Sequence, residues 1–317
     1  MSEFNLIRSH FTKSTPGALL GIGDDAALLM LSAGNVLVVS SDMLVAGTHF
    51  FHDADPFMLG YKALAVNLSD MAAMGAKPRW VTLAISLPEA DEAWLERFSA
   101  GFFSLAEPHG VELVGGDTTR GPLNLSVTIM GEVPHGQSLL RSGAQVGDEI
   151  WISGNLGDAA LALAHIQGKV ALNDAEIAAC SVSLHQPQPR VELGLALRGI
   201  AKSAIDISDG LLADIGHVLD ASNVGAQIDF SALPTSDILR NLPSQLLSKQ
   251  YILSGGDDYE LCFSADAESH EEISAIGVQL GLKLTCIGEI IAGQGCVVQD
   301  GAGIIIDVKG EGYDHFR

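Results

Sequence analysis

Carboxylates recur in this sequence in one arrangement, in which an acidic side chain directly follows small residues at the end of an apolar run or turn. Strand ends of α/β folds are where ligand-binding groups gather, and small residues let the backbone and a ligand approach closely. These positions are therefore candidates for binding chemistry. They comprise Asp25 in GIGDD, Asp42 in VVSSD, Asp117 in LVGGD, Asp206 and Asp209 in AIDISDG, and Asp257 and Asp258 in SGGDD.

Asp70 is a further candidate because it lies in ALAVNLSDMAAMG, which predicts a helix that is apolar on nearly every side. An unpaired carboxylate is costly to bury. Two partners remain open: a core Lys or Arg, of which Lys62 and Arg79 are nearest in sequence, or a metal ion. The small number of basic residues favours the metal ion.

The ligands gathered in this way are all oxygen atoms, from the carboxylates, the hydroxyls of Ser40 and Ser41, and backbone carbonyls. Oxygen ligands are typical of Mg²⁺, Mn²⁺ or Ca²⁺ and not of Zn²⁺. The EF-hand spacing is absent, which argues against a calcium sensor. Because Mg²⁺ commonly joins carboxylates to phosphates, the pattern indicates a nucleotide or another phosphorylated ligand.

The familiar nucleotide motifs are missing, since the sequence has no G-x-x-x-x-G-K-[ST] loop and no HRD or DFG set. GNLGDAA, residues 154–160, lies at an expected strand-to-helix turn. It either binds phosphate through backbone N–H groups or forms a plain turn. Arg120 and Arg141 are either phosphate clamps or surface arginines.

The composition predicts an acidic globular protein. Hydrophobic residues make up 47% of the 317 residues, which is enough for a sizeable core, and the formal net charge is −22. A charge of that sign argues against binding nucleic acid or an anionic membrane through a basic face. The four cysteines form no C-x-x-C pair, and the sequence has neither an apolar signal core nor a membrane-spanning apolar run. We therefore expect a cytoplasmic protein with reduced thiols.

Strands and helices alternate in both halves, which predicts an α/β fold of the α+β type with two mixed domains. In the first half, Asp55 and Pro56 are expected to open a helix that stops at Gly75, and Asp91 to cap another. Pro78 is the breaker beyond the end of the first of these helices. Strands are expected at 37–39, ending at the polar residues 40–42, and at 80–87, 111–114 and 123–131.

A turn-rich change in composition over 133–148 places a domain boundary near residue 140 and divides the chain into 1–140 and 141–317. The second half is expected to contain a strand at 149–153, a helix ending near Gly168, a helix after Asp209, and strands near Ile228, 260–263, Leu284 and Ile304.

In order and over nearly the whole chain, the motifs resemble those of the thiamine-monophosphate kinase family. That family belongs to the superfamily of aminoimidazole-ribonucleotide synthetase, selenophosphate synthetase and a hydrogenase-maturation protein. GIGDD and NLSDMAAMGA are similar to the superfamily pattern, and VAGTHF with the terminal GYDHF is similar to the thiamine-phosphate member. The matching segments are GIGDDAALL, SSDMLVAGTHF, YKALAVNLSDMAAMGAKP, GGDTTRG, DISDGL, SGGDDYEL and GYDHF.

The resemblance implies ATP-dependent transfer of the γ-phosphoryl group to thiamine monophosphate, several Mg²⁺ ions, and a homodimer in which two N-terminal sheets pair. It assigns ATP and metal binding and dimerisation to 1–140, and completion of the nucleotide and substrate site to 141–317. The implied metal-binding positions are Asp25, Ser40, Ser41, Asp42, Asp70, Asp117, Asp206 and Asp209; the ATP-binding positions are Gly116, Asp117, Arg141 and Ser208; and the substrate-binding positions are His49, Asp257 and Tyr313.

Two of these positions need comment. A single histidine beside two aromatic residues, such as His49 before Phe50 and Phe51, is more often packed than ligand-binding, and only the resemblance favours a substrate contact. The family more often has Glu where Asp257 stands, so the reach of this carboxylate toward the substrate is shorter. Asp24 either caps the turn that carries Asp25 or contacts metal less directly.

The expected reaction brings two anions together, so divalent ions between them would cancel the repulsion and align the attack. No general base is assigned, because the acceptor is already an ionised phosphate oxygen. Two alternatives remain open. A sibling enzyme of the superfamily would use ATP on a different acceptor, and a non-enzymatic acidic metal-binding protein would bind metal without turning over ATP.

Overall fold

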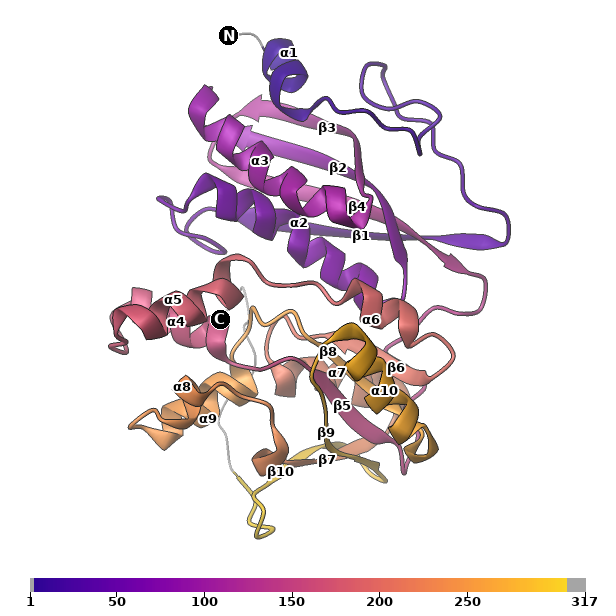
Figure 1. The fold of residues 1–317 in the computed structure, drawn as a ribbon, viewed down its shortest axis with the longest axis vertical. Coiled ribbons are helices and arrows are strands. Elements are labelled where there is room, and N and C mark those ends of the chain that lie inside the picture. Colours follow the sequence, from indigo (N-terminus) through magenta and orange to yellow (C-terminus); the bar gives the residue numbers. More distant parts are fainter. Residues whose placement is uncertain (1–2, 307–317) are drawn as a thin grey trace. The chain divides into compact units, whose positions relative to one another are not determined.

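The computed structural model describes residues 3–306, which form two units (Figure 1). Unit 1 comprises Met1–Met71 and Ala76–Gly136, and unit 2 comprises Ala72–Gly75 and Gln137–Arg317. Each unit contains one sheet and several helices, which confirms the expected α/β class with two mixed domains. Among the helices of residues 3–306, none combines the length and the apolar character that a bilayer crossing needs.

Unit 1 is built on a four-stranded sheet with the strand order β1-β4-β2-β3, and helices α2 and α3 cover one of its faces (Figure 1). β4 runs antiparallel to both of its neighbours, and β2 runs parallel to β3. The elements are α1 (Glu3–Leu6), a π-helical turn (Ile7–Phe11), β1 (Asn35–Val45), α2 (Pro56–Ala73), β2 (Lys77–Leu87), α3 (Glu92–His109), β3 (Glu112–Arg120) and β4 (Asn124–Pro134).

Both long helices of unit 1 begin where the sequence predicts. Asp55 Oδ1 accepts the backbone N–H groups two and three residues further on, at 2.9 and 3.2 Å. The Asp91 carboxylate does the same at the start of α3, at 2.9 and 3.1 Å. These bonds satisfy N–H groups that lack a partner within the helix. The end of α2 before Gly75, which has φ +60°, is also confirmed.

The two helices of unit 1 approach each other at a pair of glycines. A Cβ atom added at Gly60 of α2 would lie 2.0 Å from the Phe98 carbonyl oxygen, and one added at Gly101 of α3 would lie 1.9 Å from the Phe57 carbonyl oxygen. Each glycine therefore contacts the backbone of the other helix, and no side chain fits at either position.

Two strands of unit 1 continue further than expected. The predicted ends of the first strand at 40–42 and of the third at 114 are wrong, because β1 includes Asp42 and β3 includes Asp117. Polar residues fit within β1 because successive side chains point to opposite faces. In β3 the two glycines follow a bulge, and Gly116 lies so close to β2 that a Cβ atom would be 1.9 Å from the Leu83 carbonyl oxygen. Pro78 lies beyond the end of α2, as expected of a helix breaker, and inside β2 beside an irregularity in the pairing with β4.

Glu132 of β4 is a buried carboxylate that ties the segment before β1 to the sheet. Its two oxygens accept the Ser32 N–H at 2.9 Å and the Asn35 side-chain amide at 3.0 Å, and Arg79 lies 3.4 Å away. Burial by itself would raise the pKa of Glu132, but these hydrogen bonds and the arginine charge outweigh it, so the pKa is lowered below 4.5.

We predict that Glu132→Gln lowers the free energy of unfolding at pH 7 by about 2 kcal/mol, since it removes an ionised acceptor of three donors. The pKa of Glu132 is lower in the folded state than its unfolded-state value of 4.5, so the carboxylate stabilises the fold fully above pH 4.5. This contribution is lost as the pH falls through the folded-state pKa. Urea unfolding at a series of pH values measures the difference between wild type and variant. A difference that stays constant from pH 7 to pH 3 would contradict the assignment.

Unit 2 contains a six-stranded sheet with the order β10-β7-β9-β5-β8-β6, in which only β10 and β7 are parallel. Its first strand along the chain, β5, lies between β9 and β8, which come late in the sequence. The elements are β5 (Glu149–Ser153), α4 (Asp158–Ile166), α5 (Asp174–His185), α6 (Val191–Ala196), β6 (Ala201–Asp206), α7 (Leu211–Ser222), β7 (Gly225–Asp229), a 3₁₀ turn (Phe230–Ala232), α8 (Asp237–Arg240), α9 (Gln245–Ser254), β8 (Leu261–Ala265), a 3₁₀ turn (Ala267–Ser269), α10 (His270–Leu280), β9 (Leu284–Ile291) and β10 (Gly295–Gln299).

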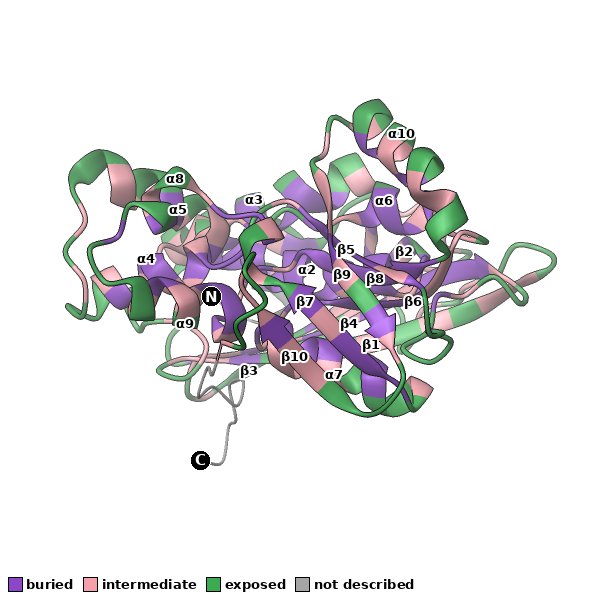
Figure 2. Cartoon of the chain, turned by 90° about the horizontal axis from the view of Figure 1, so that it is seen from below, coloured by how far each residue is buried: buried purple, intermediate pink, exposed green. Residues whose placement is uncertain are grey.

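Helix α10 of unit 2 contains buried, intermediate and exposed positions (Figure 2). Ile273 and Gly277 are buried, whereas Glu271 and the apolar Val278 are exposed. The strand and helix predictions for this unit are confirmed except the strand near Ile304. That prediction is wrong because β10 ends at Gln299, and Ile304 follows a turn with its side chain 64% exposed.

Candidate functional site

The carboxylate pattern of the sequence does not mark strand ends as expected. Asp206 is the last residue of β6, but Asp42 and Asp117 lie within strands. Asp257 follows helix α9 instead of a strand. The small residues have a different function at each position, because they allow a bulge in β3 and tight turns elsewhere.

Asp70 of α2 contacts strand β1. Its Oδ2 atom accepts a hydrogen bond from the Ser40 hydroxyl at 2.5 Å. Asp42 lies two residues beyond Ser40 and therefore on the same face of β1, toward the helices. Of the two basic residues nearest to Asp70 in sequence, Arg79 is bound to Glu132. This part of unit 1 thus gathers a hydroxyl and two carboxylates between one strand and one helix.

Ser41 lies on the opposite face of β1. Its hydroxyl contacts the Val127 carbonyl oxygen at 3.1 Å and the Thr128 hydroxyl at 3.0 Å. A contribution of Ser41 to a site with Asp70 would therefore have to come from its backbone carbonyl.

Asp25 and Asp117 line one cavity in unit 1 with a volume of about 710 Å³. Leu83, Leu113 and Val114 form part of its apolar wall, and Arg8 and Gly116 also line it. Asp24, also at this cavity, accepts the N–H of Asp25 at 2.9 Å through its side chain, so it caps the turn. The cavity offers acidic groups beside an apolar surface large enough for a ring system.

The two acidic groups of unit 1 lie at opposite edges of the sheet. Across the strands, Asp42 pairs with Val127, which pairs with Leu83, which in turn pairs with Gly116 beside Asp117. Three strand spacings separate the ends of this row, on the order of 14 Å. Within residues 3–306, no three His, Cys, Asp or Glu side chains are already assembled in a way that could hold a metal ion.

His49 lies in the turn that follows β1. Its Nδ1 atom accepts the Val45 backbone N–H at 3.0 Å, and its own backbone N–H donates to the Val45 carbonyl at 2.9 Å. The side chain is half-buried and held in one orientation by this local bond.

In unit 2, Asp206 ends β6, and the loop that follows carries Ser208 and Asp209. Asp214 lies in the first turn of α7, and its Oδ2 atom accepts the backbone N–H groups of Ser208, Asp209 and Gly210, each at 3.0 Å. Burial raises the pKa of Asp214 to about 7, although these N–H groups oppose the shift. The side chain of Asp214 therefore holds the backbone of this loop in place.

A second segment of unit 2, Gly256–Glu260, crosses the same loop. The backbone N–H of Asp257 donates to the Ser208 carbonyl at 2.9 Å, and that of Tyr259 donates to the Ile207 carbonyl at 2.8 Å. Asp257 has φ +70°, a left-handed conformation that is uncommon for a residue other than glycine. The Tyr259 hydroxyl donates to Asp257 Oδ1 at 3.1 Å, so the side chain of this expected substrate residue is also held in place.

Glu260 closes this segment with a buried ion pair. The Arg190 guanidinium donates to both of its oxygens, at 2.6 and 2.5 Å, and the Ser153 hydroxyl donates to Oε2 at 2.5 Å. Two-pronged pairs of this kind fix orientation strongly. Arg190 precedes α6 and Ser153 ends β5, so Glu260 anchors the end of the segment to both elements.

Three backbone N–H groups of the turn GNLGDAA have partners within the chain. Gly154 donates to the Lys283 carbonyl, Leu156 donates to the Pro234 carbonyl, and Gly157 donates to both oxygens of Asp258 at 3.0 and 2.9 Å. Asp258 is buried, which raises its pKa well above the usual value. These three N–H groups are therefore not available to a phosphate.

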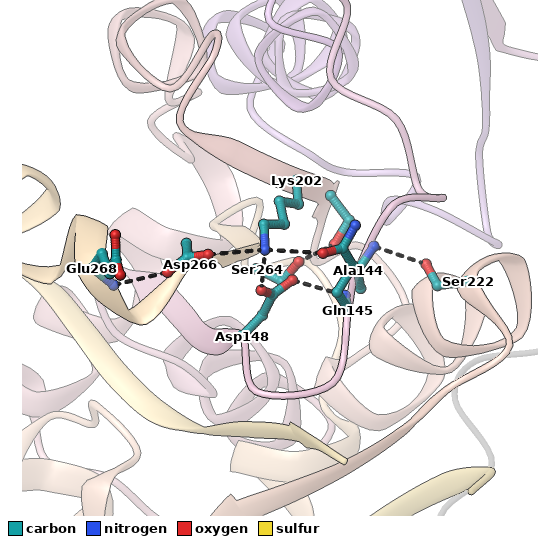
Figure 3. Close-up of polar contacts among 9 residues, drawn as sticks. Ala144, Gln145, Asp148, Lys202, Ser222, Ser264, Asp266 and Glu268 are labelled. Atoms are coloured by element: carbon teal, nitrogen blue, oxygen red, sulfur yellow. Dashed lines mark hydrogen bonds and ion pairs between the residues drawn. The ribbon is translucent and has the colours of Figure 1, made fainter. Parts of the chain in front are cut away.

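Arg141 lies in the turn-rich segment before β5, with an exposed side chain. Ser222, at the end of α7, donates from its hydroxyl to the Arg141 carbonyl at 3.3 Å. The same hydroxyl oxygen accepts the N–H groups of Gly143 and Ala144 at 3.1 and 3.2 Å. Figure 3 shows Ser222 beside this segment.

The far end of the same segment is bound to the buried carboxylate of Asp148, which is ion-paired with Lys202 (Figure 3). Lys202 lies 2.6 Å from Asp148 and 3.3 Å from Asp266, and the hydrogen bond to Asp148 raises the lysine pKa. Asp148 also accepts the Gln145 N–H at 2.8 Å. The segment that carries Arg141 is thus held at both ends within unit 2.

The remaining predicted residues are less constrained. The Arg120 guanidinium donates to the Pro88 carbonyl at 3.3 Å. Tyr313 lies outside the described residues. Sequence reasoning missed Asp214, Ser222 and Arg190. An acidic residue in the first turn of a helix, directly after DISDG, was the available signal for Asp214.

The two units correspond to the two parts of a known architecture. The sequence profile of the AIR synthase related protein, N-terminal domain, matches residues 23–133, and that of the AIR synthase related protein, C-terminal domain, matches residues 145–301. The chain is therefore an AIR synthase related protein.

Within this class, the chain belongs to the thiamine-monophosphate kinase family. It is 48% identical to the thiamine-monophosphate kinase of Escherichia coli (strain K12), over 99% of this chain and 98% of the relative. The crystal structure of thiamine-monophosphate kinase from Stenotrophomonas maltophilia K279a has 51% identity and a TM-score of 0.85, and covers 92% of this chain and 93% of that one. AaThiL complexed with AMPPCP and TMP has 29% identity and a TM-score of 0.80, with coverage of 99% and 96%.

Proposed function

We propose that this chain transfers the γ-phosphoryl group of ATP to thiamine monophosphate and forms thiamine diphosphate. One observation carries the proposal: nearly the whole chain is 48% identical to a protein named thiamine-monophosphate kinase. The complex of AaThiL with AMPPCP and TMP supports it, because a relative of the same fold takes up both kinds of ligand.

The proposed ligand atoms are all oxygens, which fits Mg²⁺. Carboxylates and hydroxyls are ligands that this ion accepts, and it usually completes its coordination with water and phosphate oxygens. An incomplete set of protein ligands is therefore compatible with it. The proposed metal-binding residues are Asp25, Ser40, Ser41, Asp42, Asp70 and Asp117 in unit 1 and Asp206 and Asp209 in unit 2.

Bound Mg²⁺ would supply the positive charge that lets two phosphate groups approach each other. The residues of the chain orient the participants. Ser40 holds the Asp70 carboxylate in one position. Gly116 and Ser208 contact ATP, Arg141 donates to its phosphates, and His49, Asp257 and Tyr313 contact thiamine monophosphate. No side chain has to accept a proton, because the attacking phosphate oxygen is already ionised.

The proposal is tested by incubating the purified protein with ATP, Mg²⁺ and thiamine monophosphate and identifying the products by chromatography. We expect thiamine diphosphate and ADP in equal amounts. Phosphorylated acceptors of other kinds, offered in parallel, should remain unchanged. ATP turnover with another acceptor and none with thiamine monophosphate would instead indicate a sibling activity.

A homodimer and a cytoplasmic location are part of the proposal. The face of β1 away from the helices exposes Leu37, Val39 and Met43, which are 46, 55 and 55% exposed. An apolar row on an edge strand favours pairing with a second copy. Sedimentation at micromolar concentration tests this, and a single monomeric species would contradict it. The four cysteines are free, as expected in a reducing compartment.

We predict that Ser222→Ala raises the KM for ATP about tenfold and leaves kcat within twofold of wild type. The hydroxyl holds the backbone at Arg141, so its loss releases the residue proposed to bind phosphate. Ser222→Thr keeps the hydroxyl and should restore the KM. Initial rates at varied ATP measure the effect. A fall in kcat with an unchanged KM would contradict this role.

A further inference from the structure

The loop after β6 carries the proposed ligands Ser208 and Asp209, and hydrogen bonds hold its backbone on both sides. Three consecutive backbone N–H groups, of Ser208, Asp209 and Gly210, point at one atom, Asp214 Oδ2, each at 3.0 Å. Asp214 is only 3% exposed. Its carboxylate is thus committed to the loop and is not available to an external ligand through this oxygen.

The loop ends at a residue whose conformation and surroundings require glycine. Gly210 has φ +117°, and a Cβ atom there would lie 2.7 Å from the Ser254 carbonyl carbon. Three neighbouring N–H groups that converge in this way carry partial positive charge at the start of α7. Without an acceptor they would be buried and unsatisfied, and the loop would have to rearrange.

The other side of the loop is held by main-chain bonds. Asp257 and Tyr259 donate to the carbonyls of Ser208 and Ile207, and the Ile207 N–H donates to the Glu260 carbonyl at 2.8 Å. On its N–H side, the segment Ser208–Gly210 is held by the side chain of Asp214.

We propose that Asp214 is a positioning residue for phosphoryl transfer: it fixes the loop so that the side chains of Ser208 and Asp209 face metal and ATP in one arrangement. This inference rests on the proposed function. Residues that orient metal ligands typically affect metal affinity or activity by 10- to 100-fold when replaced. Asp214 acts through the backbone of the ligands and not through contact with the substrate.

The test uses Asp214→Asn in the full-length protein, since the side chain keeps its shape and one acceptor oxygen. We expect the dissociation constant of Mn²⁺, measured by electron paramagnetic resonance in the presence of AMPPCP, to rise about 30-fold. The kcat for thiamine diphosphate formation should fall by a similar factor. An unchanged Mn²⁺ affinity in folded protein would overturn the inference.

Asp229→Asn is the control. The Asp229 carboxylate also accepts a backbone N–H in unit 2, that of Ser231 at 2.8 Å, but it holds no proposed metal or ATP ligand. Loss of its charge should lower the melting temperature and leave Mn²⁺ affinity within twofold of wild type. If both variants weaken Mn²⁺ binding in proportion to their loss of stability, Asp214 has only a structural role.

A double-variant cycle shows whether Asp214 acts through Asp209. Asp209→Asn alone should weaken Mn²⁺ binding strongly, and adding Asp214→Asn should then change it less than threefold. Independent effects that multiply would overturn the inference. Because the readout is binding, it also separates this inference from the proposed function: wild-type protein that binds Mn²⁺ but forms no thiamine diphosphate would refute only the latter.

A measurement on the wild-type protein covers the case in which Asp214→Asn does not fold. Amide hydrogen exchange followed by nuclear magnetic resonance should show Ser208, Asp209 and Gly210 protected to the same degree as the first turn of α7. Exchange at the rate of exposed loops would show that the three bonds do not persist, and would overturn the inference.

Discussion

Asp70→Asn is expected to lower kcat for thiamine diphosphate formation about 10³-fold, which corresponds to about 4 kcal/mol of transition-state stabilisation. The substitution removes the negative charge proposed to hold Mg²⁺. It keeps a carbonyl oxygen where Asp70 Oδ2 accepts the Ser40 hydroxyl at 2.5 Å. The melting temperature should therefore stay within about 3 °C of wild type, roughly 1 kcal/mol for a protein of this size.

The control for Asp70→Asn is Glu96→Gln, which makes the same change in charge at an exposed position of α3. Its kcat should equal that of wild type. Steady-state rates and thermal unfolding, measured on the same preparations, separate loss of chemistry from loss of fold. If Asp70→Asn retained more than a tenth of wild-type kcat at saturating Mg²⁺, Asp70 would not be a metal ligand.

Gly101→Ala is expected to lower the free energy of unfolding of unit 1 by about 3 kcal/mol. Alanine is favoured over glycine inside a helix by about 1 kcal/mol, but the added Cβ atom would lie 1.9 Å from the Phe57 carbonyl oxygen. Separation of α2 from α3 to relieve this contact opens the core, which costs more than the gain in helix propensity. Urea unfolding measures the net effect.

The same substitution at Gly216 of α7 should change the free energy of unfolding in the opposite direction. A Cβ atom there meets no atom within 4 Å, and the backbone is helical without a positive φ. Gly216→Ala should therefore raise the free energy of unfolding of unit 2 by about 0.5 to 1 kcal/mol. If both variants changed the free energy of unfolding in the same direction, the close approach of α2 and α3 at Gly101 would not explain the effect of Gly101→Ala.

Local signals in the sequence were sufficient to predict where most helices lie. Asp55 and Asp91 are N-caps with a proline or an apolar face after them, and both helices begin there. These features act over three or four residues, so they can be recognised without the rest of the chain. The recurring motifs also identified the family, because they appear in order along the chain.

Strand ends could not be predicted in the same way. Ser40, Ser41 and Asp42 look like the end of a strand, yet β1 continues because β4 supplies hydrogen bonds as far as Val45. A partner nearly ninety residues away decides this, and no local pattern encodes it. The glycines before Asp117 are tolerated in β3 for a similar reason, since β2 passes directly behind Gly116.

Residue type and spacing in the sequence were enough to identify the candidate residues. The residues that hold them in position could be identified only from the structure. Asp25 and Asp117 line one cavity, and Ser40 contacts Asp70. Asp214 and Ser222 contact the backbone of predicted residues instead of a ligand. Contacts of that kind depend on the path of the chain through space, which residue type and spacing do not specify.

The position of β5 has a consequence for how the chain folds as it is synthesised. Ile152 of β5 pairs with Cys262 and with Thr285, both of which leave the ribosome long after it. The sheet of unit 2 therefore cannot assemble until translation is almost complete. Until then Ile150, Trp151 and Ile152 belong to an unpaired apolar strand, the kind of segment that chaperones bind and that aggregates when synthesis stalls. The sheet of unit 1, by contrast, is complete once β4 has emerged.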